Sequence, residues 1–187
     1  MVYFVATPIG NLKDITFRAI ETLKEADVIF CEDTRHTIKL LNAYEIKKPL
    51  FACHKFNETE AAQKILEQSR AGKKVAVVSD AGTPVVSDPG NLVCKTLKEA
   101  GEEYTLIPGA CAFVAALVLS ALDAGKFAFV GFLPDKQSEK KAVLEKYMRG
   151  KPCDVATLQK AYRHLMSKGY DYEIAKSALA AYGECDE

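Results

Sequence analysis

The amino-acid sequence predicts an α/β fold in which a mostly parallel sheet is flanked by helices. Short runs of apolar, β-branched and aromatic residues alternate with helical patterns from the first residue to about Gly150. Several of these runs are apolar on both faces, which is typical of parallel strands buried in a sheet. Repeated alternation of strand and helix indicates parallel strands joined by helical crossovers.

Strands are expected wherever such a run is short and bounded by turn residues. The last of them follows Gly125, which we interpret as the end of the first α/β unit. The expected strands are residues 2–7, 28–31, 50–53, 75–79, 104–107 and 127–133.

The first two helices are expected from apolar stripes at helical spacing. Residues 16–26 place Ile20 and Leu23 on one stripe, and residues 37–44 repeat the pattern. Each stripe needs a sheet face to cover it, so both segments fit crossovers between parallel strands.

The next two helices are marked mainly by their ends. Residues 59–71 begin with a threonine ahead of carboxylates and stop before Gly72. Residues 89–100 begin with a proline in the first turn and stop before Gly101. Proline at the start and glycine past the end are the expected asymmetry of a helix.

Two breaks organise the rest of the chain. Gly125 is the first, and the run Gly-Lys-Pro at 150–152 is the second. A helix is expected at 138–147 between them, and two more at 155–167 and 172–182 after them. The expected domains are an α/β domain at 1–124, the start of a second domain at 125–150, and a helical tail at 151–187.

Composition excludes several classes of protein. The 187 residues are 49% hydrophobic and 27% charged, which fits a globular chain with one sizeable core or two small ones. Lys plus Arg and Asp plus Glu both number 25, so no global basic field favours binding to nucleic acid. Any polyanionic partner must therefore be held by a local patch.

Apolar segments and cysteines indicate an intracellular protein. The stretch 110–122 is too short and too rich in small residues for a membrane span, and the first residues lack the charged region of a signal peptide. We therefore expect a cytoplasmic protein without membrane contact. The six cysteines form no Cys-x-x-Cys pair, so they fit reduced buried thiols, with a reactive thiol near the C-terminus as the alternative, and no metal site.

The first strand ends in a loop that contains Pro8 and Gly10. Its glycine permits a tight turn and close approach of a ligand, and its proline stiffens the backbone. In an open α/β sheet, ligands bind where strands give way to helix N-termini, because free backbone N–H groups collect there. An ordinary turn is the alternative interpretation.

The second strand is followed by Glu-Asp-Thr-Arg-His at 32–36. A helix cap at Asp33 or Thr34 accounts for only one of these residues. Asp33 can orient a substrate hydroxyl and Arg35 can hold a phosphate, while a solvated loop is the alternative. After the third strand, His54 is either a general base or a hydrogen-bonded structural residue.

The loop after the fourth strand carries the strongest signal. Residues 79–90 contain two glycines, two prolines and two aspartates between a buried strand and a helix. Loops of this composition commonly wrap a small molecule. The fifth loop, 107–112, opens a helix of small residues whose N-terminus is available to a ligand. Neither loop has the dinucleotide fingerprint or a P-loop.

These motifs occur together in an order that resembles one known family. They are Ala-Thr-Pro-Ile-Gly-Asn-Leu at 6–12, Glu-Asp-Thr-Arg at 32–35, His54 with Asn57-Glu58, Ser-Asp-Ala-Gly-Thr-Pro at 79–84, Ser-Asp-Pro-Gly at 87–90, Pro-Gly-Ala at 108–110 and Gly-Phe-Leu-Pro at 131–134. The chain closely resembles the ribosomal RNA small-subunit methyltransferase I family, within the tetrapyrrole methylase superfamily, over roughly residues 1–147.

The resemblance implies an S-adenosylmethionine-dependent enzyme that methylates the ribose 2′-oxygen of a cytidine in small-subunit ribosomal RNA. It implies two sets of site residues. The cofactor-binding set is Pro8, Gly10, Asp80, Ala81, Gly82, Thr83, Pro108, Gly109 and Ala110. The catalytic set, facing the acceptor nucleotide, is Asp33, Arg35, His54, Asn57 and Glu58.

Partners follow from the same resemblance, which implies small-subunit ribosomal RNA or the ribosomal subunit as substrate and a homodimer as the assembly. Basic residues around the helix 138–147 are either a solvated helix face or a local phosphate patch. The RNA-binding candidates are Lys136, Lys140, Lys141, Lys146 and Arg149.

The resemblance also predicts a C-terminally truncated chain, because family members continue for roughly another hundred residues into a second domain that closes over the donor. Without that domain the donor loses hydrogen bonds and apolar contacts. Each lost contact can cost about 1 kcal/mol of binding free energy, so donor binding is weakened. The alternative function is therefore a truncated, non-catalytic protein that folds and dimerises without methyl transfer.

Overall fold

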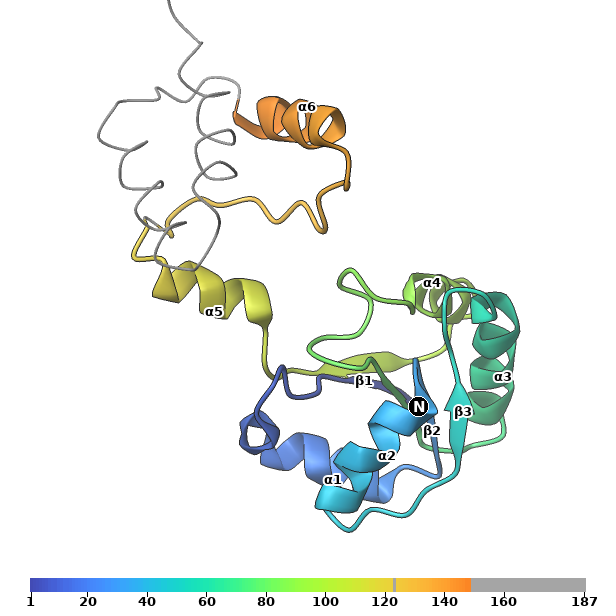
Figure 1. The fold of residues 1–187 in the computed structure, drawn as a ribbon. Coiled ribbons are helices and arrows are strands. Elements are labelled where there is room, and N and C mark those ends of the chain that lie inside the picture. Colours follow the sequence, from blue (N-terminus) through green and yellow to red (C-terminus); the bar gives the residue numbers. More distant parts are fainter. Residues whose placement is uncertain (123, 149–187) are drawn as a thin grey trace, which may run out of the picture. The chain divides into compact units, whose positions relative to one another are not determined.

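The computed structural model describes residues 1–122 and 124–148 (Figure 1). By its internal contacts the chain divides into two units, Met1–Ala116 and Leu117–Glu187. The first unit contains the whole sheet. Among the described residues, no helix has the length and apolar character needed to cross a membrane.

Five parallel strands form the sheet, in the spatial order β3-β2-β4-β1-β5. The predicted α/β class and mostly parallel sheet are thereby confirmed. β1 lies inside the sheet, with Val2 paired to Val75 on one side and to Tyr104 on the other. The strands are β1 (Val2–Val5), β2 (Val28–Cys31), β3 (Leu50–Ala52), β4 (Val75–Val78) and β5 (Tyr104–Ile107).

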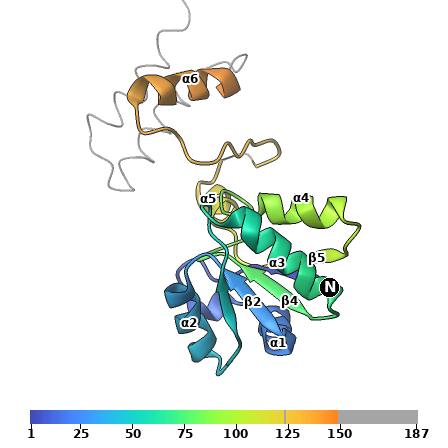
Figure 2. The same cartoon turned by 90° about the vertical axis from the view of Figure 1, so that its right-hand side faces the viewer.

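Helices cover both faces of the sheet, as Figures 1 and 2 show. Apolar residues of α1 and α2 share one buried cluster with β1, β2 and β4, and those of α3 and α4 share another. The helical elements are η1 (Leu12–Asp14), α1 (Phe17–Glu25), α2 (Thr34–Ala43), α3 (Glu58–Arg70), α4 (Asn91–Glu99), α5 (Ala112–Leu119) and α6 (Gln137–Met148).

The topology has a switch point at the carboxyl ends of β1 and β4. These strands are neighbours, but β1 leads into α1 on one face and β4 leads into α4 on the other. In open α/β sheets, ligands bind at such a switch point, where the outgoing loops separate. The loops after β1 and β4 are the ones singled out by their composition.

Several element boundaries differ from the sequence-based expectations. The strand at 127–133 is wrong, since these described residues adopt no regular strand. The fourth helix does not begin at Pro89, because its N-cap is Gly90 at φ +122°, a backbone conformation outside the helix. The second helix begins at Thr34 rather than residue 37, with Asp33 as its cap. The helix predicted at 138–147 is present as α6.

The described cysteines are free thiols. Cys31 and Cys53 are buried and Cys94 and Cys111 are half-buried. Burial raises the pKa of Cys53 to about 11, so this thiol stays protonated at neutral pH. The described residues contain no group of three or more side chains able to hold a metal ion. The predicted tail helices at 155–167 and 172–182 lie outside the described residues.

Candidate functional site

The loops after β1 and β4 are joined by backbone hydrogen bonds. Thr7 N–H donates to the Gly82 carbonyl at 2.8 Å, and Gly82 N–H donates to the Thr7 carbonyl at 3.0 Å. The Thr7 hydroxyl, which is buried, also donates to the Ser79 carbonyl at 3.2 Å. Two segments that are 75 residues apart in sequence (7 and 82) therefore form one surface at the carboxyl edge of the sheet.

The turn after β5 packs against the same surface. A Cβ added at Gly109 would lie 3.0 Å from the Ala6 Cβ, so only glycine fits there without a shift of the neighbouring backbone. A Cβ added at Gly82 would lie 3.5 Å from Ile9 Cγ2 and 3.9 Å from the Ala110 carbonyl oxygen. Residues predicted to bind the cofactor from three separate loops are thereby brought together.

The loop after β4 is held in an unusual backbone conformation. Gly82 has φ +79°, and Val85 and Ser87 have φ +78° and +64°. A β-branched residue at positive φ is a genuine outlier, and such residues cost about 1–3 kcal/mol each. Backbone strain of this kind clusters at ligand-binding loops. Within this loop Ala81 is exposed and Thr83 is half-buried.

Asp80 connects this loop to the start of α2. Its Oδ1 accepts a hydrogen bond of 3.0 Å from the Asp33 N–H. Asp33 in turn caps α2, because its Oδ1 accepts from the Arg35 N–H at 2.8 Å. The Arg35 guanidinium also forms a hydrogen-bonded ion pair with the Asp33 carboxylate, in which Nη2 lies 2.7 Å from Oδ2. The Arg35 side chain is nevertheless 88% exposed. Asp33 and Arg35 therefore act as one unit.

The hydrogen bonds from Arg35 lower the pKa of Asp33 from its ordinary 3.8 to about 2. A lowered folded-state pKa stabilises the fold above pH 3.8, and this contribution is lost as the pH falls toward 2. We expect carboxyl-carbon NMR shifts to show Asp33 titrating near 2, and Arg35→Ala to raise that midpoint toward 3.8. Arg18→Ala, on α1, is the control; an unmoved midpoint in Arg35→Ala would refute the pairing.

Further carboxylates surround this unit. Burial raises the pKa of Glu32, and the nearby carboxylates of Asp80 and Asp88 raise it further. Burial also raises the pKa of Asp88, with Asp80 adding to the effect and a hydrogen bond involving Ser79 opposing it. Since the pKa of Glu32 is raised and that of Asp33 is lowered, Glu32 is a better proton acceptor than Asp33. Sequence reasoning did not select it, because its burial depends on the sheet around it.

Three predicted catalytic residues lie in the loop after β3 and at the start of α3, and two of them, Asn57 and Glu58, make structural hydrogen bonds here. Asn57 accepts from the His54 N–H at 2.8 Å and donates to the Ala52 carbonyl at 3.0 Å, so it closes the turn. The buried Nδ1 atom of His54 has no hydrogen-bond partner among the described residues, while its ring meets the Phe56 ring edge-on at 6.2 Å. Of the three predicted catalytic residues here, His54 is therefore the one with a side-chain atom free to hydrogen-bond a substrate.

Glu58 caps α4 from outside that helix. Its Oε1 accepts from the N–H groups of Gly90 and Leu92, both at 2.8 Å. We expect Glu58→Ala to lower the free energy of unfolding by about 1–2 kcal/mol, since the N–H groups of the N-cap Gly90 and of Leu92 in the first turn lose their acceptor. Urea unfolding followed by circular dichroism measures the loss. Glu60→Ala, which removes only an exposed pair with Lys64, is the control, and equal effects of the two variants would contradict the cap.

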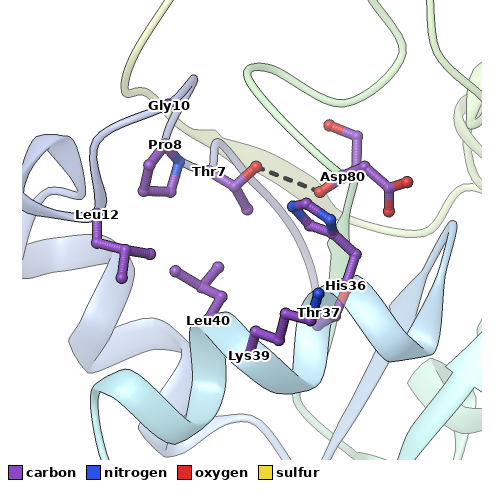
Figure 3. Close-up of a pocket in the computed structure, with 10 residues that line it drawn as sticks. Thr7, Pro8, Gly10, Leu12, His36, Thr37, Lys39, Leu40 and Asp80 are labelled. Atoms are coloured by element: carbon purple, nitrogen blue, oxygen red, sulfur yellow. Dashed lines mark hydrogen bonds between the residues drawn. The ribbon is translucent and has the colours of Figure 1, made fainter.

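A pocket of about 310 Å³ lies between the loop after β1 and helix α2. Figure 3 shows Leu12 and Leu40 facing each other on one side of it, with the side chains of His36 and Lys39 projecting from α2. Sequence reasoning missed most of its lining. The lining residues are Thr7, Pro8, Gly10, Leu12, His36, Thr37, Lys39, Leu40, Ser79 and Asp80.

The RNA-binding candidates lie in and around α6. Lys136 and Lys141 are exposed and Lys140 is half-buried. Lys136 forms an exposed ion pair with Glu139 at 3.4 Å. Lys146 belongs to α6, and Arg149 lies outside the described residues.

Comparison with known proteins confirms the resemblance read from the motifs. Residues 1–182 match the family of tetrapyrrole (corrin/porphyrin) methylases. A solved uroporphyrin-III-C-methyltransferase from Thermus thermophilus superimposes with a TM-score of 0.52 and 24% identity, covering 65% of this chain and 52% of that one. At that identity the likeness establishes the fold alone.

Curated relatives are more similar in sequence. The ribosomal RNA small subunit methyltransferase I of Haemophilus influenzae is 49% identical over 145 residues, which are 78% of this chain and 51% of that protein. Its counterpart in Mycoplasmopsis pulmonis is 49% identical over 149 residues, covering 80% of this chain and 67% of that protein. The chain thus spans about half to two thirds of the length of these relatives. By family match and sequence identity, it belongs to the tetrapyrrole methylases and, among them, to the ribosomal RNA small subunit methyltransferase I family.

Proposed function

We propose that this protein binds S-adenosylmethionine and methylates the ribose 2′-oxygen of a cytidine in small-subunit ribosomal RNA. The observation that carries the proposal is the convergence of three loops at one edge of the sheet, through the Thr7–Gly82 bridge and the contact of Gly109 with Ala6. The names of the relatives support an RNA substrate.

The residues present suit the donor. Gly82 and Gly109 let the loops after β4 and β5 pack closely against Ile9 and Ala6, so the three loops that carry the proposed donor-binding residues form one surface. When bound, S-adenosylmethionine supplies a methyl group activated by its sulfonium. The proposed donor-binding residues are Pro8, Gly10, Asp80, Ala81, Gly82, Thr83, Pro108, Gly109 and Ala110.

Acceptor chemistry is assigned to the ends of β2 and β3. With a pKa of about 2, Asp33 is ionised at neutral pH and accepts hydrogen bonds, but it is a weak base. Its role is to hold Arg35, whose exposed guanidinium can contact a phosphate. His54, with its partnerless Nδ1, and Glu32, with its raised pKa, are the groups suited to take the proton from the ribose hydroxyl.

The remaining RNA contacts are proposed for the basic residues at positions 136 to 149, a segment that includes α6. A chain with zero net charge needs a local concentration of lysine and arginine to hold a polyanion. Lys136, Lys140, Lys141, Lys146 and Arg149 form that proposed patch. Binding of small subunits should weaken steeply as salt concentration rises.

Two measurements test the function. Calorimetry should show binding of S-adenosylmethionine, and small subunits from a strain lacking the modification should then acquire 2′-O-methylcytidine, identified by mass spectrometry of the nucleosides. Absence of donor binding even at millimolar concentration would reject the proposal and favour the non-catalytic alternative. Donor binding with methylation at another atom would reject the 2′-oxygen.

Assembly and domain boundaries are part of the same proposal. We propose a homodimer, and units at 1–124, 125–150 and 151–187. Light scattering after gel filtration measures the mass of the particle, and a monomer at all concentrations would exclude the dimer. Limited proteolysis should cut near residues 125 and 150, and first cuts inside 1–116 would contradict the boundaries.

A further inference from the structure

The pocket between the loop after β1 and helix α2 adjoins the proposed donor-binding residues Pro8, Gly10 and Asp80, and its α2 side carries residues to which the proposed function gives no role. His36 and Lys39 stand three residues apart on α2, so their side chains emerge on the same face of the helix. Both residues are exposed, and neither has an ion-pair partner among the described residues. They supply donors for an anion at the rim of the pocket.

The opposite part of the pocket is apolar. Leu12 and Leu40 face each other there, with Pro8 beside them (Figure 3). Leu12 is 49% exposed, and η1 buries none of its residues, so this apolar side chain is available to a ligand. A flat aromatic ring packed against these side chains would remove apolar surface from water, which is the main source of affinity in small-ligand pockets.

The floor supplies polar groups. Thr37 is 2% exposed, and its hydroxyl has no hydrogen-bond partner of ordinary geometry among the described residues. Burial raises the pKa of the nearby Cys31 thiol, and the Thr37 hydroxyl opposes that rise only in part. Asp80 lines the same pocket and supplies an acceptor. A buried hydroxyl without a partner costs free energy unless a ligand or water satisfies it.

A nucleotide has an anionic phosphate, a flat base and polar hydroxyl groups. The anion donors, the apolar wall and the polar floor of this pocket are complementary to these three parts. A volume of about 310 Å³ is at the lower end of the range of roughly 300–1,000 Å³ for small-ligand pockets, so it suits one unit rather than several. We infer that this pocket binds a single nucleotide of the RNA substrate, with its base against Leu12 and Leu40 and its phosphate at Lys39 and His36. This inference names a subsite of the proposed function and rests on it for the identity of the RNA.

Cytidine 5′-monophosphate and cytidine are the probes, titrated into the full chain and followed by NMR shifts of the Thr37 and Gly10 amides. The monophosphate should bind about five-fold more tightly than cytidine, the contribution of exposed charge pairs. Lys39→Glu should remove that advantage. Lys95→Glu, an equal charge change on α4 across the sheet, is the matched control and should preserve it.

Leu12→Ala tests the apolar wall separately, and it should weaken the monophosphate and cytidine equally, by about three-fold for a partly exposed leucine. Affinity for S-adenosylmethionine should stay within about two-fold in both variants. If Lys39→Glu weakens S-adenosylmethionine as much as the monophosphate, the pocket belongs to the donor and the inference is wrong. Nucleotide affinity that neither variant changes would also overturn it. Failure of methyl transfer with these nucleotide effects intact would reject the proposed function instead.

Discussion

In the variant Gly82→Val, affinity for S-adenosylmethionine should fall by roughly 5- to 150-fold, the equivalent of about 1–3 kcal/mol of backbone strain. Gly82 adopts φ +79°, a conformation that β-branched residues strongly disfavour. Space is not the obstacle, because a Cβ there meets Ile9 only at ordinary contact distance. Valine should therefore pull the loop away from its bridge with Thr7, and donor binding must then restore it.

Gly72→Val is the matched control. Gly72 has nearly the same φ, +78°, with open space around its Cβ position, but it lies after α3, before β4 begins, at the edge of the sheet away from the site. It should cost stability without changing donor affinity, as calorimetry can measure. Unchanged affinity in Gly82→Val, or equal losses in both variants, would show that the donor pocket is misplaced.

Replacing Phe30 with alanine should lower the free energy of unfolding by about 3–5 kcal/mol. Phe30 is 2% exposed in β2, and its ring stacks on Phe51 with centroids 5.5 Å apart. Because whole domains are stable by only about 5–15 kcal/mol, this single change should bring the protein near its unfolding threshold at room temperature. Urea denaturation monitored by far-ultraviolet circular dichroism measures the change.

Phe17→Ala supplies the comparison, since the same atoms are removed from a side chain that is 87% exposed. It should change stability by no more than about 0.5 kcal/mol. A loss below about 1 kcal/mol for Phe30→Ala would mean that the cluster around α3 and α4 does not depend on this ring.

The strands of the sheet could be predicted because each carries its own signal. Val28–Cys31 and Val75–Val78 are apolar at every position and buried at every position, as central parallel strands require. The run at 127–133 is also apolar at every position apart from Gly131, yet it forms no strand. Strand propensity reflects packing against neighbouring strands, and none of the five strands of the sheet comes from this run.

The start of α4 could not be predicted from its own residues. Pro89 satisfies every local criterion for a first turn, but the acceptor that caps the helix is Glu58, which lies 32 residues away from Gly90 in sequence. Gly90 accordingly stays outside the helix at φ +122°. When the capping residue belongs to another element, the residues next to the helix give no indication of where the helix begins.

The candidate site likewise has one part that could be predicted from residue types and one part that depends on the folded structure. Loops rich in glycine and proline after β1 and β4 were identifiable because backbone freedom and stiffness are properties of single residue types. The pocket lining on α2 was missed because the helix was expected to begin after His36. With Asp33 as the cap, His36 and Lys39 fall on one face, a spacing visible only once the true start is known.

The place of β1 inside the sheet has a consequence for how the chain folds during synthesis. Its partners, β4 and β5, are made only after about 75 and 104 residues have been translated. At roughly 5–20 residues per second, the earliest of the five strands waits about 5–20 s before both of its edges can be paired. Pairing over such sequence separations slows folding and exposes the apolar strand to aggregation. During that interval the apolar residues of β1 are open to contact with other chains, and a chaperone bound to them would block that route to aggregation.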